Sequence, residues 1–175
     1  MIEIKNICQE KPFIIFKKIY NEPLHAGQKN IEAAAISSYN KDINEIDSRY
    51  VNIKFINDNK FIFFTNYNSP KSKAFYSMNQ IAVLFFWPSI NTQIRIKAFI
   101  KKTPISLNKE YFKSRSADKN ALAIASEQSE ITSSYEDILI RYQQVKSNQN
   151  LMDCPDYWGG FEFTPYSFEF WKGDE

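Results

Sequence analysis

Residues 66–73 gather amides, hydroxyls and two lysines at the predicted start of a helix. Ser69 followed by Pro70 is typical of an N-cap and a first helical residue. Unpaired backbone N–H groups at such a start, with the Ser69 hydroxyl and the Lys71 ammonium beside them, form a physically sensible binding place for a phosphate. An ordinary capped helix with solvated lysines fits the same spacing, so the pattern alone leaves both interpretations open.

A second candidate phosphate site consists of Tyr111 and Arg115, which are four residues apart. This spacing puts both side chains on one helix face, where a phenol and a guanidinium can converge on a phosphate. A surface Tyr–Arg stack explains the spacing equally well. Arg49 and Lys54 are five residues apart on one predicted strand, so they should point to opposite faces unless a bulge or a strand end intervenes, and should touch different ligand groups or none.

Few residues are available for other kinds of chemistry. A single histidine, His25, excludes a multi-histidine metal site within one chain, and any Ser-His-Asp scheme would depend on that residue. We expect His25 to lie at the surface, in the segment that leads to the first strand. Cys8 and Cys154 belong to no Cys-x-x-Cys or Cys/His cluster, which predicts two free thiols. No catalytic side chain and no metal ligand is singled out.

The bulk properties limit the class of protein. A chain of 175 residues fits one domain, residues 1–175, and its formal net charge of +2 is too small to indicate a surface for nucleic acid. A small phosphorylated ligand remains possible. No stretch approaches the ~20 apolar residues that cross a bilayer, and the start lacks a signal-peptide pattern. We therefore expect a cytoplasmic protein without a membrane partner.

The aromatic content is high, with 16% Phe, Trp and Tyr. Such side chains must fill the interior or line a site, and they favour strands. On their own, Tyr157, Trp158 and Trp171 are expected to be core aromatics.

Hydrophobic periodicity predicts strands joined by hairpins, with helices between and after them. The clearest hairpin has a four-residue polar loop at 57–60. Strands are expected at 31–38, 49–56, 61–65, 81–87 and 93–101, with a last hairpin of 160–163 and 167–171 around Pro165. Helices are expected at 12–20, 70–78, 109–115 (capped by Ser106), 121–126 and up to Val145 (capped by Ser133 with Glu136), followed by a loop at 147–150.

This order of elements favours an antiparallel α+β barrel over a doubly wound parallel sheet. The chain has only four glycines and no glycine-rich turn, which excludes a Rossmann dinucleotide site.

Taken in order, the motifs make the chain resemble the pyridoxamine 5'-phosphate oxidase family, from about Pro12 to the last residue. The strongest are Tyr-Phe-Lys-Ser-Arg at 111–115 and Trp-Gly-Gly-Phe at 158–161. The others are Arg-Tyr-Val-Asn-Ile-Lys at 49–54, Phe-Thr-Asn at 64–66, Asn-Ser-Pro-Lys at 68–71, Leu-Phe-Phe-Trp at 84–87, Gln-Ile-Arg-Ile at 93–96, Ser-Glu-Gln-Ser at 126–129 and Glu-Phe-Trp at 169–171.

The resemblance implies a six-stranded antiparallel split β-barrel with peripheral helices, and a homodimer that binds FMN at its interface. Hydride would pass from the C4' carbon of a vitamin B6 phosphate to flavin N5, and oxygen would then reoxidise the flavin and release hydrogen peroxide. The implied cofactor-binding residues are Arg49, Lys54, Phe64, Thr65, Ser69, Lys71, Gln93, Gln128, Ser129 and Trp171. The implied substrate-binding residues are Lys54, Tyr111, Arg115 and Lys119.

Three departures from the family pattern bear on activity. Pro70 stands where the family usually has a basic residue, and Lys119 stands where it usually has a substrate-binding serine. The sequence also does not contain the Arg-Leu-His-Asp-Arg segment with which family members contact substrate and flavin. Positioning and charge are what such a segment contributes, so a weakened or different substrate preference is expected.

Three hypotheses follow. The first is an FMN-dependent oxidase that makes pyridoxal 5'-phosphate from pyridoxamine or pyridoxine 5'-phosphate. The second is an FMN-binding split-barrel protein without this activity, which acts on another small substrate or serves as a flavin reductase or carrier. The third is a β-barrel that binds single-stranded nucleic acid through aromatics and lysines, which the near-neutral charge disfavours.

Overall fold

The computed structural model describes residues 1–126, 132, 134–148 and 150–173. The chain forms two compact units, which are described separately. The first comprises Met1–Phe64, Ala74–Lys101 and Phe161–Glu175, and the second comprises Thr65–Lys73 and Lys102–Gly160.

Within the described part of the chain, eight strands form one sheet in the order β1-β4-β5-β8-β7-β6-β2-β3. The expected α+β class is confirmed, but the expectation of six strands closed into a barrel is wrong, since the sheet has eight strands and is not closed. The pair β1–β4 is parallel, so the sheet is also not wholly antiparallel. The strands are β1 (Glu3–Ile7), β2 (Ala33–Asn40), β3 (Glu45–Asn52), β4 (Phe55–Asp58), β5 (Lys60–Asn66), β6 (Gln80–Trp87), β7 (Thr92–Lys102) and β8 (Trp158–Lys172).

The strand expected at 49–56 is two strands, β3 and β4, with Ile53 and Lys54 between them. The Ile53 N–H donates to the carbonyl of Glu32 (2.9 Å) and the Lys54 N–H donates to that of Ile62 (2.8 Å). The chain therefore leaves β2, the partner of β3, and joins β5, the partner of β4. The hairpin of β4 and β5 is confirmed, but its loop is shorter than expected.

Two residues make the turn of this hairpin, because Asn57 and Lys60 still pair across it. Asp58 adopts a φ of 54°, in the left-handed region that a short aspartate side chain tolerates.

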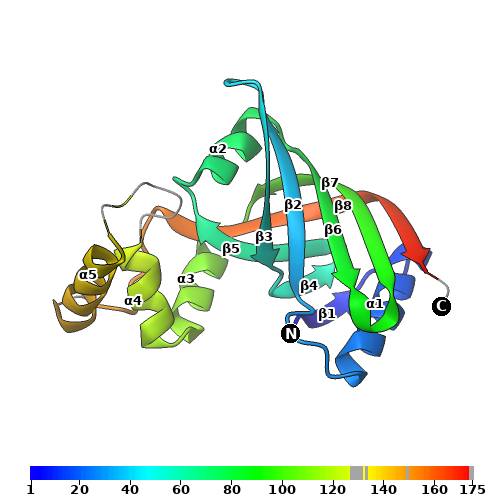
Figure 1. Ribbon diagram of the computed structural model, residues 1–175, viewed down its shortest axis with the longest axis horizontal. Coiled ribbons are helices and arrows are strands. Elements are labelled where there is room, and N and C mark those ends of the chain that lie inside the picture. Colours follow the sequence, from blue (N-terminus) through cyan, green and yellow to red (C-terminus); the bar gives the residue numbers. More distant parts are fainter. Residues whose placement is uncertain (127–131, 133, 149, 174–175) are drawn as a thin grey trace. The chain divides into compact units, whose positions relative to one another are not determined.

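The expected hairpin around Pro165 is wrong, because β8 is one strand of 15 residues. Figure 1 shows β8 as a long continuous strand coloured orange to red. A proline removes one ladder donor but does not reverse the chain.

The helices are α1 (Lys11–His25), α2 (Pro70–Ser77), α3 (Ile105–Ser114), α4 (Ala117–Ala125) and α5 (Tyr135–Asn148), with a short 3-10 turn η1 (Pro88–Ile90). The helix expected from Pro70 is confirmed. The helix expected at 12–20 is longer than predicted and contains Pro23. None of the helices in the described part of the chain combines the length and the hydropathy that a membrane crossing requires.

Two helix caps differ from expectation. Pro104 is the N-cap of α3, so Ser106 lies inside the helix. In α5 the Ser134 hydroxyl accepts from the Asp137 N–H (3.1 Å), while the expected cap Ser133 lies outside the described residues. The helix also extends through Ser147 into the expected loop.

Aromatic side chains build the core of the first unit, as the composition indicates. Phe16 of α1 is fully buried, and its ring centroid lies 5.1 Å from that of Phe61 and 5.4 Å from that of Phe85. Both contacts are edge-to-face, the geometry that aromatic quadrupoles favour. The cluster fixes α1 against β5 and β6.

Candidate functional site

Lys71 lies in the first turn of α2 and is almost completely buried, with 3% of its surface exposed. Its Nζ donates to the Ser69 hydroxyl at 3.0 Å. The Ser69 and Ser72 hydroxyls both donate to the carbonyl of Asn66, at 2.7 and 2.9 Å. An ammonium and two hydroxyls are therefore held at a helix start, which is a favourable place for an anion.

The expectation of unpaired backbone N–H groups in this loop is wrong for four residues. The N–H of Asn68 donates to the Asn66 side chain (2.7 Å), and that of Ser69 donates to the Asn66 carbonyl (3.3 Å). The N–H groups of Ser72 and Lys73 donate to the carbonyl of Ser69. The tight turn uses these donors itself, so the Lys71 charge is the main attraction for an anion here.

Tyr111 and Arg115 meet on the indole of Trp158. The Arg115 guanidinium carbon lies 4.6 Å from the centre of the Trp158 ring, and the Tyr111 ring stacks on the same indole at 6.3 Å with a 14° interplanar angle. Helix α3 ends at Ser114, and Arg115 follows it in an extended conformation. Tyr111 and Arg115 therefore come together because both contact the Trp158 indole, and not because they share a helix face.

The Arg115 guanidinium is only partly satisfied. Its Nη2 donates to the Lys119 carbonyl at 2.9 Å, whereas its Nη1 is buried without a hydrogen-bond partner among the described residues. Burial lowers the pKa of Arg115, although it stays a cation at neutral pH. Burial also raises the pKa of Tyr111, opposed by the nearby Arg115 charge. A buried cationic donor beside a neutral phenol suits an oxyanion.

Lys119 contributes its backbone rather than its side chain to this arrangement. Its carbonyl accepts from Arg115, and its own surface is exposed at the first turn of α4. The role expected of the Lys119 ammonium in binding the substrate stays a prediction.

Gly159, next to Trp158, lies against Tyr67 and Asn108. A Cβ added at Gly159 would overlap the Tyr67 hydroxyl and would lie 2.5 Å from Asn108 Nδ2. We expect Gly159→Ala to lower the free energy of unfolding by about 1–3 kcal/mol, measured by urea unfolding, because the side chains must shift. Combined with Tyr67→Phe, which removes the overlapped hydroxyl, the loss should be smaller than the sum of the two single losses. Strict additivity would contradict this explanation.

In the first unit, Arg49 on β3 forms an ion pair with Asp47. Lys54 is half-buried in the break between β3 and β4, and Phe64 on β5 contacts Phe55 edge-to-face at 6.2 Å. Arg49 and Lys54 do not share one strand, so the expectation that they point to opposite faces of it no longer applies.

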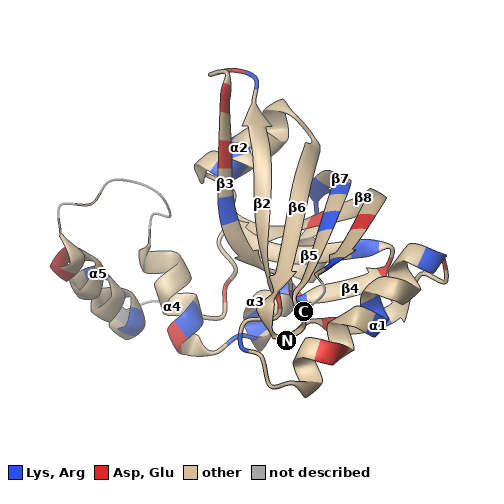
Figure 2. Cartoon of the chain, turned by 45° about the vertical axis from the view of Figure 1, so that its right-hand side comes forward, with Lys and Arg blue, Asp and Glu red and all other residues tan. Residues whose placement is uncertain are grey.

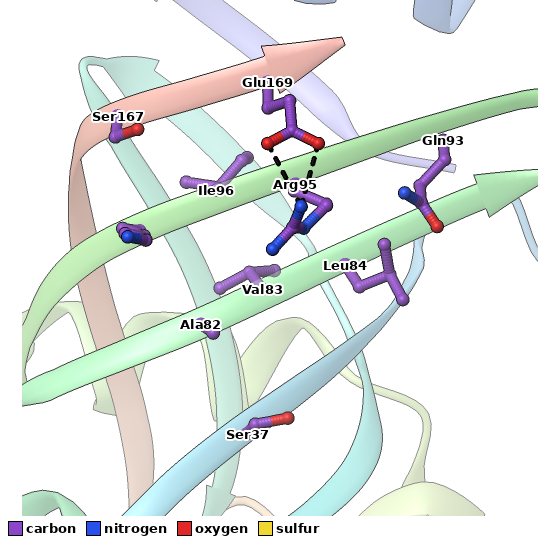
Figure 3. A pocket seen from close by; sticks show the side chains of 10 residues that line it. Ser37, Ala82, Val83, Leu84, Gln93, Arg95, Ile96, Ser167 and Glu169 are labelled. Atoms are coloured by element: carbon purple, nitrogen blue, oxygen red, sulfur yellow. Dashed lines mark hydrogen bonds and ion pairs between the residues drawn. The ribbon is translucent and has the colours of Figure 1, made fainter. Parts of the chain in front are cut away.

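Gln93 lines a pocket of about 320 Å³ on the face of β6 and β7. Arg95 and Glu169 point toward each other across it, with Arg95 Nη1 2.9 and 3.1 Å from the two carboxylate oxygens (Figure 3). Val83 and Leu84 supply apolar surface.

The expected core position of Trp171 is wrong, because it is 50% exposed and borders a separate cavity of about 120 Å³.

The remaining expectations have mixed outcomes. Trp158 is buried, as expected of a core aromatic, but no sequence signal indicated that Arg115 stacks on its ring. Thr65 is buried at the end of β5, and His25 is exposed at the end of α1. Both cysteines are free, as predicted. Gln128 and Ser129 lie outside the described residues.

Curated relatives match this chain over most of its length. The chain is 35% identical over 167 residues to pyridoxine/pyridoxamine 5'-phosphate oxidase 1 of Hydrogenovibrio crunogenus, covering 94% of this chain and 76% of the relative. It is 34% identical over 167 residues to pyridoxine/pyridoxamine 5'-phosphate oxidase of Haemophilus influenzae, covering 95% and 79%. A chloroplastic relative from Arabidopsis thaliana is 34% identical, and the chain spans 31% of its length. No family model matches the chain.

Solved structures share the fold. PhzG from Burkholderia lata 383, in complex with tetrahydrophenazine-1-carboxylic acid, has a TM-score of 0.87 at 23% identity, covering 93% of this chain and 80% of that one. A pyridoxamine 5'-phosphate oxidase-related, FMN-binding protein from Nostoc punctiforme has a TM-score of 0.73 at 9% identity, covering 90% and 83%. With identities above 30% over most of two bacterial relatives, the chain belongs to the pyridoxine/pyridoxamine 5'-phosphate oxidase family.

Proposed function

We propose that the chain is an FMN-dependent oxidase that converts pyridoxamine or pyridoxine 5'-phosphate to pyridoxal 5'-phosphate with oxygen as acceptor. The observation that carries the proposal is the buried Arg115 Nη1, which has no hydrogen-bond partner among the described residues, in a guanidinium that lies, like the Tyr111 ring, against the Trp158 indole. A phosphate oxygen would satisfy it by a charge-assisted hydrogen bond. Tyr111 of the same unit would assist. Lys54 and Lys119 stay proposed substrate-binding residues.

The residues in the loop before α2 fit the phosphate of FMN. Lys71 supplies a buried positive charge at a helix start, and Ser69 fixes its ammonium at 3.0 Å. When bound, FMN would accept a hydride from the substrate and pass the electrons to oxygen. The other residues proposed to contact it are Arg49, Lys54, Phe64, Thr65, Gln93, Gln128, Ser129 and Trp171.

The protein side chains would bind and orient rather than transfer protons. A substrate phosphate held by Arg115 fixes one end of the molecule, and partial burial excludes water that would weaken the ion pair. We assign no catalytic side chain, since hydride transfer to a flavin needs position above all.

A homodimer is part of the proposal. The edge strand β3 exposes Ile46 (78%) and Tyr50 (77%), large apolar surfaces that a partner would cover. We expect sedimentation to show a dimer, and a monomer at micromolar concentration would argue against it. A cytoplasmic location and a single FMN-binding domain over residues 1–175 stay predictions.

Two assays test the function. A purified protein that binds FMN and forms peroxide and pyridoxal 5'-phosphate from pyridoxamine 5'-phosphate supports the oxidase. Bound FMN without peroxide above a no-enzyme control would leave the alternative, a flavin protein with another small substrate or a reductase or carrier role. Nucleic-acid binding is disfavoured, since basic and acidic residues are mixed along the described elements (Figure 2).

A further inference from the structure

The backbone on either side of Trp158 is fixed by hydrogen bonds within the second unit. On one side, the Tyr67 N–H donates to the carbonyl of Tyr157 at 2.6 Å. On the other side, the Gly160 carbonyl accepts from the Thr103 N–H (3.0 Å) and from the Tyr67 hydroxyl (3.1 Å). The Trp158 indole, on which Arg115 stacks, therefore belongs to a segment that hydrogen bonds fix on both sides.

Asn108 completes this arrangement with its side-chain amide. Its Oδ1 accepts from the Gly160 N–H (2.9 Å) and from the Thr103 hydroxyl (2.6 Å), while its Nδ2 donates to the Tyr67 hydroxyl (3.0 Å). The residue is buried, with 4% of its surface exposed. An amide can accept on one side and donate on the other, so Asn108 satisfies three polar groups at once, two of them buried and one partly buried.

The same amide reaches toward the loop before α2. Tyr67 directly follows Asn66, whose carbonyl accepts from the Ser69 and Ser72 hydroxyls. Asn108 thus joins the loop that holds Lys71 to the segment that holds Trp158. Both lie in the second unit.

We propose that Asn108 is a positioning residue for phosphate capture: through Tyr67 and Gly160 it holds Trp158 in place, so that the Arg115 guanidinium on the indole faces the incoming phosphate. The identity of the phosphorylated ligand rests on the proposed function. In this proposal Asn108 acts on Arg115 only indirectly, through its hydrogen bonds to Tyr67 and to the Gly160 backbone. Its loss should therefore weaken ligand capture while kcat changes little.

Two variants separate this role from general stability. Tyr67→Phe removes one hydroxyl but keeps the ring over which the Lys102 ammonium lies at 4.2 Å. Asn108→Leu keeps the approximate volume but leaves the Gly160 N–H without its acceptor. As a matched control, Tyr20→Phe in the first unit removes another buried phenol hydroxyl, one that accepts from the Ile2 N–H at 2.7 Å.

Ligand capture is measured by titrating pyridoxal 5'-phosphate into each protein. We expect the Kd to rise about 5- to 10-fold for Tyr67→Phe, as for the loss of one buried hydrogen bond, and about 30-fold for Asn108→Leu. The Kd of Tyr20→Phe should stay within about twofold of wild type at a similar loss of stability. If Asn108→Leu does not fold, Tyr67→Phe decides. A Kd for Tyr67→Phe equal to that of the control would overturn the proposal.

A second readout does not depend on the ligand. The indole N–H signal of Trp158, assigned in ¹⁵N-labelled protein with Trp158→Phe, should move in Tyr67→Phe and stay in place in Tyr20→Phe. If wild type does not bind pyridoxal 5'-phosphate, the proposed function fails, and this signal alone tests the positioning. An unmoved Trp158 signal would overturn the inference whatever the substrate is, and a shifted one would support it.

Discussion

Arg115→Met is expected to lower kcat/KM for pyridoxamine 5'-phosphate by roughly 30- to 1000-fold. The reason is that a buried, charge-assisted hydrogen bond between the guanidinium and the substrate phosphate is worth about 2–4 kcal/mol. The Nη1 atom is buried and unused by the described residues, so its contribution should go entirely to the ligand. Steady-state peroxide formation gives kcat/KM, and FMN fluorescence gives the flavin Kd, which should change by less than about threefold.

Two further variants sharpen this result. Arg115→Lys keeps the charge but loses the planar fork that stacks on Trp158, so it should fall between wild type and Arg115→Met. Lys113→Met is the control, since Lys113 is an exposed cation in the same unit, two residues before Arg115. Equal loss of FMN binding and substrate capture in Arg115→Met would refute the assigned role.

Lys71→Met is expected to raise the Kd for FMN about 100-fold, because it removes the buried positive charge at the start of α2. The exposed Lys73, two residues later in the same helix, is the matched control, and Lys73→Met should change the Kd by less than about threefold. Fluorescence titration gives both values.

Riboflavin, which lacks the phosphate, tests the assignment to that group. Wild type and Lys71→Met should bind riboflavin with similar Kd values. If Lys71→Met weakens riboflavin as much as FMN, Lys71 does not bind the phosphate.

Local sequence signals predicted the elements that depend on neighbouring residues. The Ser69-Pro70 pair correctly indicated the start of α2, and the apolar run before Pro88 correctly indicated β6. These signals reflect capping and the missing proline N–H, which act within a few residues.

Elements that depend on distant partners were mispredicted. The break at Ile53 is made by the carbonyls of Glu32 and Ile62, and neither is visible in the alternation of residues 49–56. Pro165 looked like a turn because its strand context comes from β5 and β7 on either side of β8. Tertiary pairing overrides local propensity in such cases.

In the candidate site, too, local spacing predicted some residues, whereas contacts with distant residues could not be predicted. The four-residue spacing singled out Tyr111 and Arg115, but they meet because both contact Trp158, which lies more than forty positions later in the chain. Asn108 gave no signal at all, since a buried amide is recognisable only from the donors and acceptors that surround it.

The most direct test of the account is to mix the FMN-loaded protein with pyridoxine 5'-phosphate in the absence of oxygen. The account predicts that the visible flavin absorbance is lost, that pyridoxal 5'-phosphate appears in equal amount, and that Arg115→Met needs far more substrate for the same bleaching. A protein that keeps its oxidised flavin spectrum at saturating substrate, or that binds no FMN, would contradict it.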